Sequence, residues 1–255
     1  MDNILFVYLK NTFKESMSFK LNNLLVIIGH IVAALLNFYL WYYIGGNGIG
    51  SLNKSEIIVY VLMLYGISMS VNQNADYYIA QDIRSGDIII DLVRPFNYIY
   101  LQLLKRFSSF VYNVVIFVIP CLIISLFIVK ISLLNILLFF MCLIMAFLLT
   151  FLIDCIFGLL ICKVMNNWGI DTMKGMFMGL LSGELIPFFL LPSALTFVLS
   201  ILPFYYISYY PIMILIGKEW NWYLILVLIG WLIVLYVVVL ILWKKIRRSL
   251  MINGG

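Results

Sequence analysis

The sequence predicts an all-α integral membrane protein: six transmembrane helices, an N-terminal interfacial helix and a re-entrant helical hairpin before the last span. Three observations support this fold class. Of the 255 residues, 65% are hydrophobic and 11% are charged, whereas a soluble domain is about 45–50% apolar and about 25% charged. Several apolar runs reach the length of about 20 residues that a helix needs to cross a bilayer. The longest apolar stretch is interrupted by prolines. This composition disfavours a soluble enzyme, a disordered chain and a secreted disulfide scaffold.

The first 23 residues mix charged and apolar side chains and lack the layout of a signal peptide. Apolar residues from Ile4 to Met17 recur at spacings of three and four, with Lys10, Lys14 and Glu15 on the other side. This pattern is typical of an amphipathic helix lying in the membrane interface. We therefore predict an interfacial helix at 1–23, with a short solvated helix as the alternative.

Charged residues and turn signals divide the rest of the chain into membrane spans. The predicted spans are 24–44, 57–75, 107–129, a fourth between Lys130 and Lys163, then roughly 171–190, and 222–243. Together they form one transmembrane domain over 1–255, with no soluble domain.

The stretch between Lys174 and Lys218 contains a single charge, Glu184. It is too long for one span and too short for two spans with a loop. Because proline removes a backbone donor and breaks helices, its prolines divide it further. These are Pro187, Pro192, Pro203 and Pro211. We expect one span followed by two short helices, at 191–217, that dip into the outer leaflet as a re-entrant segment.

The distribution of basic residues predicts the orientation. Six spans place both termini on one side, and with that side cytoplasmic only Lys54, Lys130 and Lys218 of the 16 Lys and Arg lie outside. Basic residues collect on the cytoplasmic side of membrane proteins. The chain is thus expected to be a multi-pass protein of the cell membrane with both termini cytoplasmic. This bias also explains the net charge of +5, so we expect no nucleic-acid partner.

The longest polar segment, 76–104, falls between the second and third spans on the predicted cytoplasmic side. Its first part, up to Arg84, has a helical pattern, and Ser85-Gly86 marks a turn. The isoleucines at 88–90 make it too apolar for a bare solvated linker. We predict a docking surface for a cytoplasmic partner. The alternative is a loop that packs on its own membrane domain.

Three glycines of the predicted fifth span, Gly175, Gly179 and Gly183, recur every four residues. This spacing places them on one helical face, where a second helix can approach closely. The face could form a dimer seam or a contact beside the translocation path, or simply pack within the subunit.

Two acids, Asp154 and Glu184, fall at membrane depth, where charge is costly and faces the interior or a wet cavity. Their roles could be substrate contact, proton coupling or a hydrogen bond between spans. The alternative is a protonated acid bonded to a neighbouring helix. Candidate partners are His30, Asn37, Asn72 and Gln73.

Metal, disulfide and catalytic signatures are absent from the sequence. The four cysteines lie in apolar runs without a C-x-x-C pair, and a single histidine is too few for a zinc site. No H-E-x-x-H or G-x-S-x-G motif occurs. Gly217-Lys218 is followed by Glu219 and lacks the upstream glycine of a phosphate-binding loop. We expect no cofactor and no catalysis in this chain, so any ATP hydrolysis belongs to a separate polypeptide.

Two segments resemble type-2 ABC exporter permeases, and within them the daunorubicin-export-like branch. Residues 83–87 (IRSGD) and 91–97 (DLVRPFN) resemble the cytoplasmic signature of that family. Residues 182–187 (SGELIP), with Leu-Pro at 191–192, Leu-Pro-Phe at 202–204, Pro211 and Gly217, resemble its fifth span and re-entrant segment. Glu184 departs from the family, which often has a small or apolar residue there.

The resemblance implies a permease subunit that forms a homodimer or related heterodimer, with each subunit bound to a cytoplasmic ABC ATPase that carries ATP and Mg²⁺. It implies export of an amphipathic or hydrophobic substrate such as a drug, peptide antibiotic or lipid-like molecule. The coupling role is carried to Asp82, Arg84, Gly86, Asp87, Arg94 and Pro95. Residue usage suggests a bacterial source. The alternatives are a stand-alone secondary transporter or substrate-binding membrane module using the buried acids, and an intramembrane enzyme.

Overall fold

A computed structural model describes residues 20–46, 52–89, 97–161, 167–219 and 221–253. Every regular element in these ranges is helical, which confirms the predicted all-α class. The longer helices are α2 (Lys20–Gly46), α3 (Lys54–Val71), α4 (Ala75–Ser85), α6 (Tyr98–Asn113), α7 (Ile119–Ile128), α8 (Leu133–Ile161), α9 (Asn167–Leu181) and α12 (Trp222–Asn253). The predicted interfacial helix at 1–23 falls almost wholly outside the described residues.

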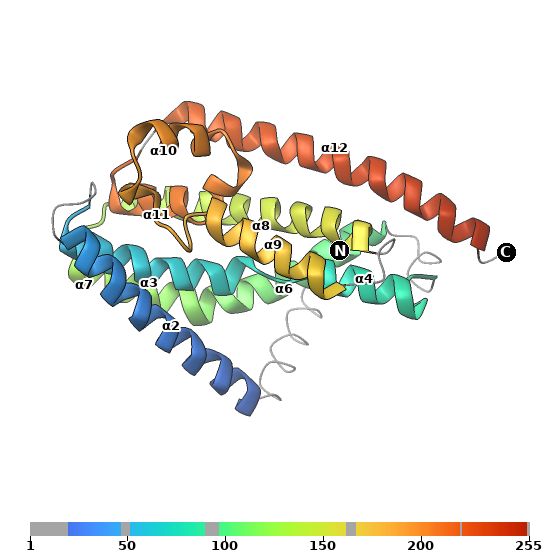
Figure 1. Cartoon of the computed structure of the whole chain (residues 1–255), viewed down its shortest axis with the longest axis horizontal. Coiled ribbons are helices and arrows are strands. Elements are labelled where there is room, and N and C mark those ends of the chain that lie inside the picture. The colour runs from blue at the N-terminus through green and yellow to red at the C-terminus, as the bar shows by residue number, and fades with distance from the viewer. Residues whose placement is uncertain (1–19, 47–51, 90–96, 162–166, 220, 254–255) are drawn as a thin grey trace.

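The helices form an elongated bundle (Figure 1). α8 lies at its centre and packs against α3, α4, α11 (Tyr209–Ile216) and α12. α4 and the C-terminal end of α12 lie at one end of the bundle, which we call the α4 end. The short helices α10 (Ser193–Ser200) and α11 lie at the opposite end, called the α10 end.

Four stretches of the described residues are long and apolar enough to cross a membrane: Lys54–Ser85, Tyr98–Ile128, Leu133–Leu160 and Trp222–Arg247. α2 has 27 residues, many of whose side chains are not described, and α9 has 15. At 1.5 Å per residue, α9 extends about 22 Å, which is less than the hydrocarbon core of about 30 Å. The count of six spans therefore stays a prediction.

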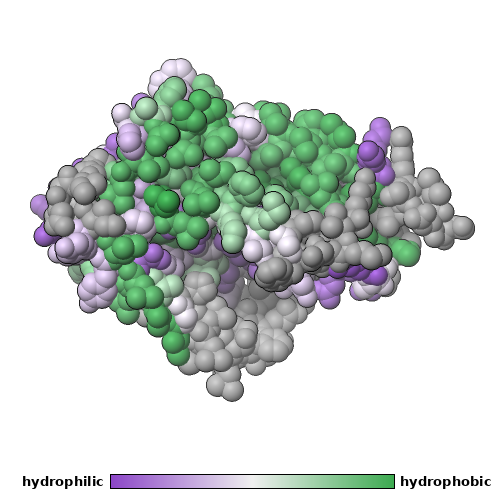
Figure 2. All heavy atoms as spheres, viewed as in Figure 1, coloured by the Kyte–Doolittle hydropathy of each residue, from purple (hydrophilic) through white to green (hydrophobic). Residues whose placement is uncertain are grey.

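The surface of this bundle is largely apolar. Large side chains such as Phe127, 88% exposed, and Leu133, 73% exposed, point outward from helices that are long enough to span a bilayer. Hydrophobic side chains cover most of the visible face over α10 and α12 (Figure 2). Lipid is the environment that such a surface requires, since water would make this exposure costly.

The third span contains a π-helical turn, η1 (Val114–Val118), which joins α6 to α7. Within it the N–H of Ile119 donates to the carbonyl of Val114, five residues earlier. Pro120 follows directly and has no N–H to continue the α-helical ladder. The wider turn accommodates the proline, and helical structure continues from Tyr98 to Ile128.

The predicted C-terminal boundary of the span at 171–190 is wrong, because α9 ends at Leu181. Gly183 adopts a left-handed backbone with φ of 82°, which terminates the helix. Pro187 then precedes a short 3₁₀ turn, η2 (Phe188–Leu190). Gly183 thus lies beyond the helix, and only Gly175 and Gly179 of the predicted glycine face belong to α9.

Two short helices, α10 and α11, follow within 191–217 as expected, joined by the 3₁₀ turn η3 (Pro203–Tyr206). Pro187, Pro203 and Pro211 are buried, and Pro192 is exposed at the start of α10. Whether these helices form a re-entrant hairpin in a bilayer stays a prediction.

Candidate functional site

The helix α4 is set off from α3 by a break at residues 72–74. Asn74 adopts a left-handed conformation with φ of 47°, and α4 begins at the next residue. Gly86, with φ of 81°, ends the helix in the left-handed conformation that favours glycine. The helical pattern up to Arg84 and the turn at Ser85-Gly86 therefore lie where the sequence placed them.

One face of α4 is buried and the other is exposed. Ala75, Asp76, Ile79 and Ala80 are buried, and α4 packs mainly on α8. The exposed side carries Tyr77, Tyr78, Gln81, Arg84 and Ser85. α4 thus presents a polar and aromatic surface at the α4 end of the molecule, while its other face is fixed to the core.

Close contact between α4 and α8 depends on Gly158. A Cβ at this position would lie 2.9 Å from the Cα and 3.0 Å from the carbonyl oxygen of Asp76. Real Cβ atoms essentially never come so close to backbone atoms. Glycine is therefore required for the two backbones to pack at their observed separation.

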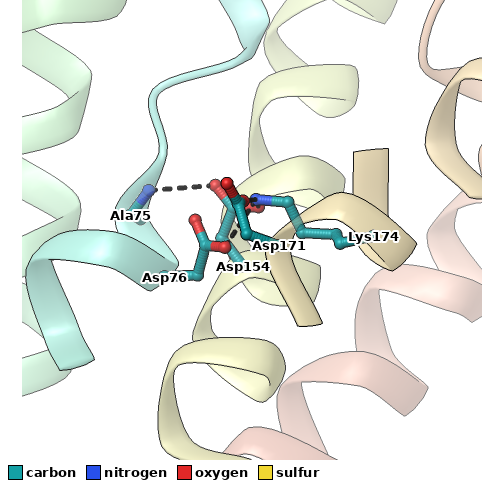
Figure 3. A network of polar contacts seen from close by, with 5 residues as sticks. All are labelled: Ala75, Asp76, Asp154, Asp171 and Lys174. Atoms are coloured by element: carbon teal, nitrogen blue, oxygen red, sulfur yellow. Dashed lines mark hydrogen bonds and ion pairs between the residues drawn. The ribbon is translucent and has the colours of Figure 1, made fainter. Parts of the chain in front are cut away.

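A buried network of charges joins α4, α8 and α9 (Figure 3). The Lys174 Nζ lies 2.7 Å from the Asp76 Oδ2 and 3.1 Å from the Asp154 Oδ1. The second oxygen of Asp154 accepts a hydrogen bond of 3.1 Å from the backbone N–H of Ala75. The side chains of all three charged residues are at most 8% exposed. We call Asp76, Asp154 and Lys174 the charge triad.

The charge triad holds two carboxylates and one ammonium group in a buried site. Charges buried in this way must be paired, because their desolvation cost is several kcal/mol. Removing one partner leaves the other charges buried and unpaired. Asp171, also on α9, lies 4.0 Å from Lys174 at the edge of this site, and its side chain is 64% exposed. The charge triad therefore connects three separate helices at one defined geometry.

Sequence reasoning missed two members of the charge triad. Lys174 was expected at the inner membrane boundary, but it is buried and turned toward Asp154. Of the candidate partners of Asp154, Asn37 bonds to the Tyr65 hydroxyl and Gln73 to the backbone carbonyl of Ser70. The side chain of His30 lies outside the described part. No spacing in the sequence singles out Lys174, because Arg84 lies nearer to Asp76 along the chain and Lys163 lies nearer to Asp154.

Those residues predicted to couple to an ATPase that the structure describes differ in their surroundings. Asp82 turns inward, where its Oδ2 accepts hydrogen bonds from the Tyr98 hydroxyl (2.9 Å) and the Gln102 Nε2 (2.6 Å). Arg84 is exposed on α4. Asp87 is exposed in the turn after Gly86 and accepts a 2.6 Å hydrogen bond from the Ser85 hydroxyl. Arg94 and Pro95 lie outside the described residues.

The remaining acid of the sequence prediction, Glu184, lies ten residues after Lys174 and is not part of the charge triad. It follows the end of α9, about 10 Å of helix beyond Lys174. Beside it the carbonyl of Gly183 accepts a 2.9 Å hydrogen bond from the Tyr60 hydroxyl of α3. The carbonyl of Ser182 accepts one of 3.2 Å from the N–H of Tyr209 in α11. Asp154, which pairs with Lys174 at the middle of α9, is therefore separate from Glu184, which follows the end of that helix.

α4 is thus packed on its own bundle through one face and exposed on the other. A family model described as ABC-2 family transporter protein matches residues 23–254. The chain belongs to this family. No curated protein and no solved structure matches the chain.

Family membership identifies the chain as a membrane component of an ABC transporter. This confirms the resemblance to type-2 ABC permeases drawn from the two sequence segments. The daunorubicin-export-like branch stays a narrower prediction. Within the described part of this ABC-2 protein, no group of three or more metal-binding side chains occurs.

Proposed function

We propose that this protein is the membrane-spanning permease subunit of an ATP-driven exporter, and that α4 is its contact with a separate ATPase subunit. ATP and Mg²⁺ would be bound by that partner. The observation that carries the proposal is the two-sided α4: one face is fixed to the bundle by the charge triad and Gly158. The other face is exposed at the α4 end.

The exposed side of α4 has the composition of a docking surface rather than of a lipid-facing helix. Tyr77 is 57% exposed and Tyr78 is 41% exposed, and they stand beside the exposed Gln81 and Arg84. Tyrosine and arginine are the residues that protein interfaces favour. Arg106 stacks 3.8 Å from the ring centre of Tyr78, which holds that ring in place.

A force applied to α4 would reach the opposite end of the molecule through α9. The charge triad prevents α4 from sliding on α8 and α9 without breaking buried ion pairs. α9 then leads into the turn at residues 182–185, whose carbonyls accept hydrogen bonds from α3 and α11. Closure of the ATPase around ATP would thereby shift the helices of the α10 end and favour a second conformation of the pathway.

A second permease subunit, identical or related, would pack along α9. The side chains of Met173, Met176, Phe177 and Leu180 are 46% to 62% exposed. Gly175 lies among them with open space where a Cβ would be. A small residue surrounded by apolar side chains lets a neighbouring helix approach closely in a membrane.

Orientation and substrate complete the proposal. Because exposed basic residues on α4 and on the C-terminal part of α12 lie at the α4 end of the bundle, that end would face the bacterial cytoplasm together with both termini. The apolar lining expected of such a bundle suits an amphipathic or hydrophobic cargo such as a drug, peptide antibiotic or lipid-like molecule.

The stand-alone transporter is the weaker candidate, because its two acids are far apart and Asp154 is paired with Lys174.

The proposal is tested by purifying the protein from native membranes in mild detergent and identifying the chains that accompany it. We expect a P-loop ATPase in stoichiometric amount, lost or strongly reduced in Arg84→Glu. The matched control is Lys245→Glu, which makes the same charge reversal at an exposed position of α12. Isolation of the wild-type protein alone, or equal recovery of the ATPase with both variants, would refute the docking role of α4.

A further inference from the structure

A cavity of about 450 Å³ opens at the α10 end, bounded by η2, α10, η3, α11 and the start of α12. This volume lies in the range of small-molecule sites. Its walls are notably aromatic. The rings lining it are Phe188, Phe189, Phe197, Tyr205, Tyr209 and Tyr223.

The inner wall of this cavity is a preformed stack of rings. Phe188 stacks on Tyr205 with ring centres 5.8 Å apart, and Tyr209 lies 5.1 Å from each of them. All three rings are buried. Phe197 and Tyr223, by contrast, are 61% and 41% exposed at the rim. A ligand would therefore meet a rigid aromatic wall and an accessible aromatic edge.

A carboxylate without a cationic partner faces the same space. Glu219 lines the cavity and accepts a 2.5 Å hydrogen bond from the Tyr205 hydroxyl. Lys218, its neighbour in sequence, lies 3.1 Å from Glu56 instead. Across the described ranges no cation pairs with Glu219. Lys218 also lines the cavity, but Glu56 neutralises it, so Lys218, Glu56 and Glu219 together carry one net negative charge.

We propose that this cavity binds an organic cation, an ammonium group that carries an apolar tail. Ring faces attract cations through their quadrupole, and the attraction strengthens when the cation is desolvated. The single carboxylate supplies the one countercharge that a monocation requires. The apolar rings would cover the tail. Neither the carboxylate nor the rings depend on α4 or on an ATPase. The cation site can therefore be tested independently of the proposed docking role.

The ionisation of Glu219 supports this reading. Burial raises the pKa of the Glu219 carboxyl above its ordinary value, and the hydrogen bond from Tyr205 offsets part of that rise. A cation requires the ionised form, so affinity should increase as the pH rises through the pKa of Glu219. The other groups facing this carboxyl are the hydroxyls of Tyr205, Tyr206, Tyr209 and Tyr210 and the ammonium group of Lys218, which is paired with Glu56.

The test uses the full chain in nanodiscs of phosphatidylglycerol, whose headgroup has no ammonium group, at high ionic strength. Hexyltrimethylammonium is titrated by calorimetry, with hexanol as the neutral probe and empty nanodiscs as background. We expect saturable binding of the cation only. Glu219→Gln should raise its Kd about tenfold or more and remove the pH dependence.

Two further variants keep the result interpretable. Phe197→Ala changes an exposed rim ring without disturbing the core and should raise the Kd about threefold to tenfold. Asp171→Asn removes one exposed carboxylate at the other end of α9 and should leave the Kd unchanged. Equal binding of hexanol, an unchanged Kd in Glu219→Gln, or an equal loss in Asp171→Asn would overturn the proposal.

A second set of nanodiscs distinguishes the source of the ammonium group. Phosphatidylcholine is added in increasing proportion while the probe is titrated. Competition by this lipid assigns the site to a membrane headgroup, and an unchanged Kd assigns it to a free amphipathic cation. Each outcome of this competition keeps the ammonium chemistry, which is overturned by the absence of probe binding in the first set or by any of the three contrary results named above.

Discussion

The two ends of this bundle are held together by different chemistry. At the α4 end, three buried charges connect α4, α8 and α9. At the α10 end, stacked rings and neutral hydrogen bonds connect η2, η3, α11, α3 and the turn after α9, and the one ion pair described there, Lys218 with Glu56, is partly exposed. A charge network fixes one geometry and fails when one partner is lost. Aromatic packing distributes its contribution over many contacts. The α4 end is therefore suited to transmit a displacement, and the α10 end is suited to adapt its shape.

The largest effect is expected for Lys174→Met, which leaves two carboxylates buried without a cation. We expect a loss of about 3–5 kcal/mol in the free energy of unfolding, because stranded buried charges are strongly destabilising. The measurement is the thermal midpoint of the purified protein in detergent. Asp171→Asn, at the exposed edge of the network, is the control and should change little.

A triple variant separates charge from packing at the same site. Asp76→Asn, Asp154→Asn and Lys174→Met together remove every charge of the triad, and much of the lost stability should return. If the single and triple variants are equally unstable, or the single variant matches wild type, the triad does not fix α4 as described.

The second prediction concerns Gly158→Ala, which brings a methyl group within about 3 Å of the α4 backbone. We expect a loss of about 1–3 kcal/mol from overpacking, measured again as the thermal midpoint. Gly230→Ala is the matched control, because open space surrounds that position of α12. Alanine favours a helix over glycine, so this variant should be neutral or slightly stabilising. Identical effects of the two alanines would contradict a close contact between α4 and α8.

A smaller effect is expected at the α10 end from Tyr60→Phe. This variant keeps the ring but leaves the carbonyl of Gly183 without its 2.9 Å hydrogen bond in a buried setting. The expected loss in the free energy of unfolding is about 1–2 kcal/mol. It is measured by urea or thermal unfolding. A loss as large as that of Lys174→Met would erase the distinction between the two ends.

The smallest effect is predicted for Trp231→Phe. The Trp231 Nε1 donates a 2.7 Å hydrogen bond to the carbonyl of Ile201, near the surface of the bundle. Loss of this bond should lower the free energy of unfolding by about 0.5–1 kcal/mol. The same thermal assay, run side by side on Trp231→Phe and Tyr60→Phe, measures this difference. A larger loss of stability in Trp231→Phe than in Tyr60→Phe would contradict the predicted order.

Much of the fold follows from the sequence because hydrophobic length and proline position act locally. Apolar runs give the helices, Gly86 ends α4, and Pro192 and Pro203 flank the short helix α10. The end of α9 was misplaced because the run stays apolar past Leu181. Only the left-handed conformation of Gly183, which the tertiary contacts with Tyr60 and Tyr209 stabilise, ends the helix there.

The candidate site was less predictable because its contacts join distant segments. Asp76, Asp154 and Lys174 stand on three helices, and no spacing rule connects them. A lysine near the end of a span usually lies at the membrane interface, which is where the sequence placed Lys174. Likewise Asp82 looks like a surface acid on α4, yet it accepts hydrogen bonds from Tyr98 and Gln102 of α6.

The most direct test of the account is to place a photo-crosslinking residue at Gln81, on the exposed face of α4, in cells that express the natural partners. Phe197, exposed at the opposite end, is the matched position. Illumination should join position 81, but not position 197, to a P-loop ATPase identified by mass spectrometry. An ATPase crosslink at both positions, or at neither while the protein is folded and in the membrane, would contradict the account.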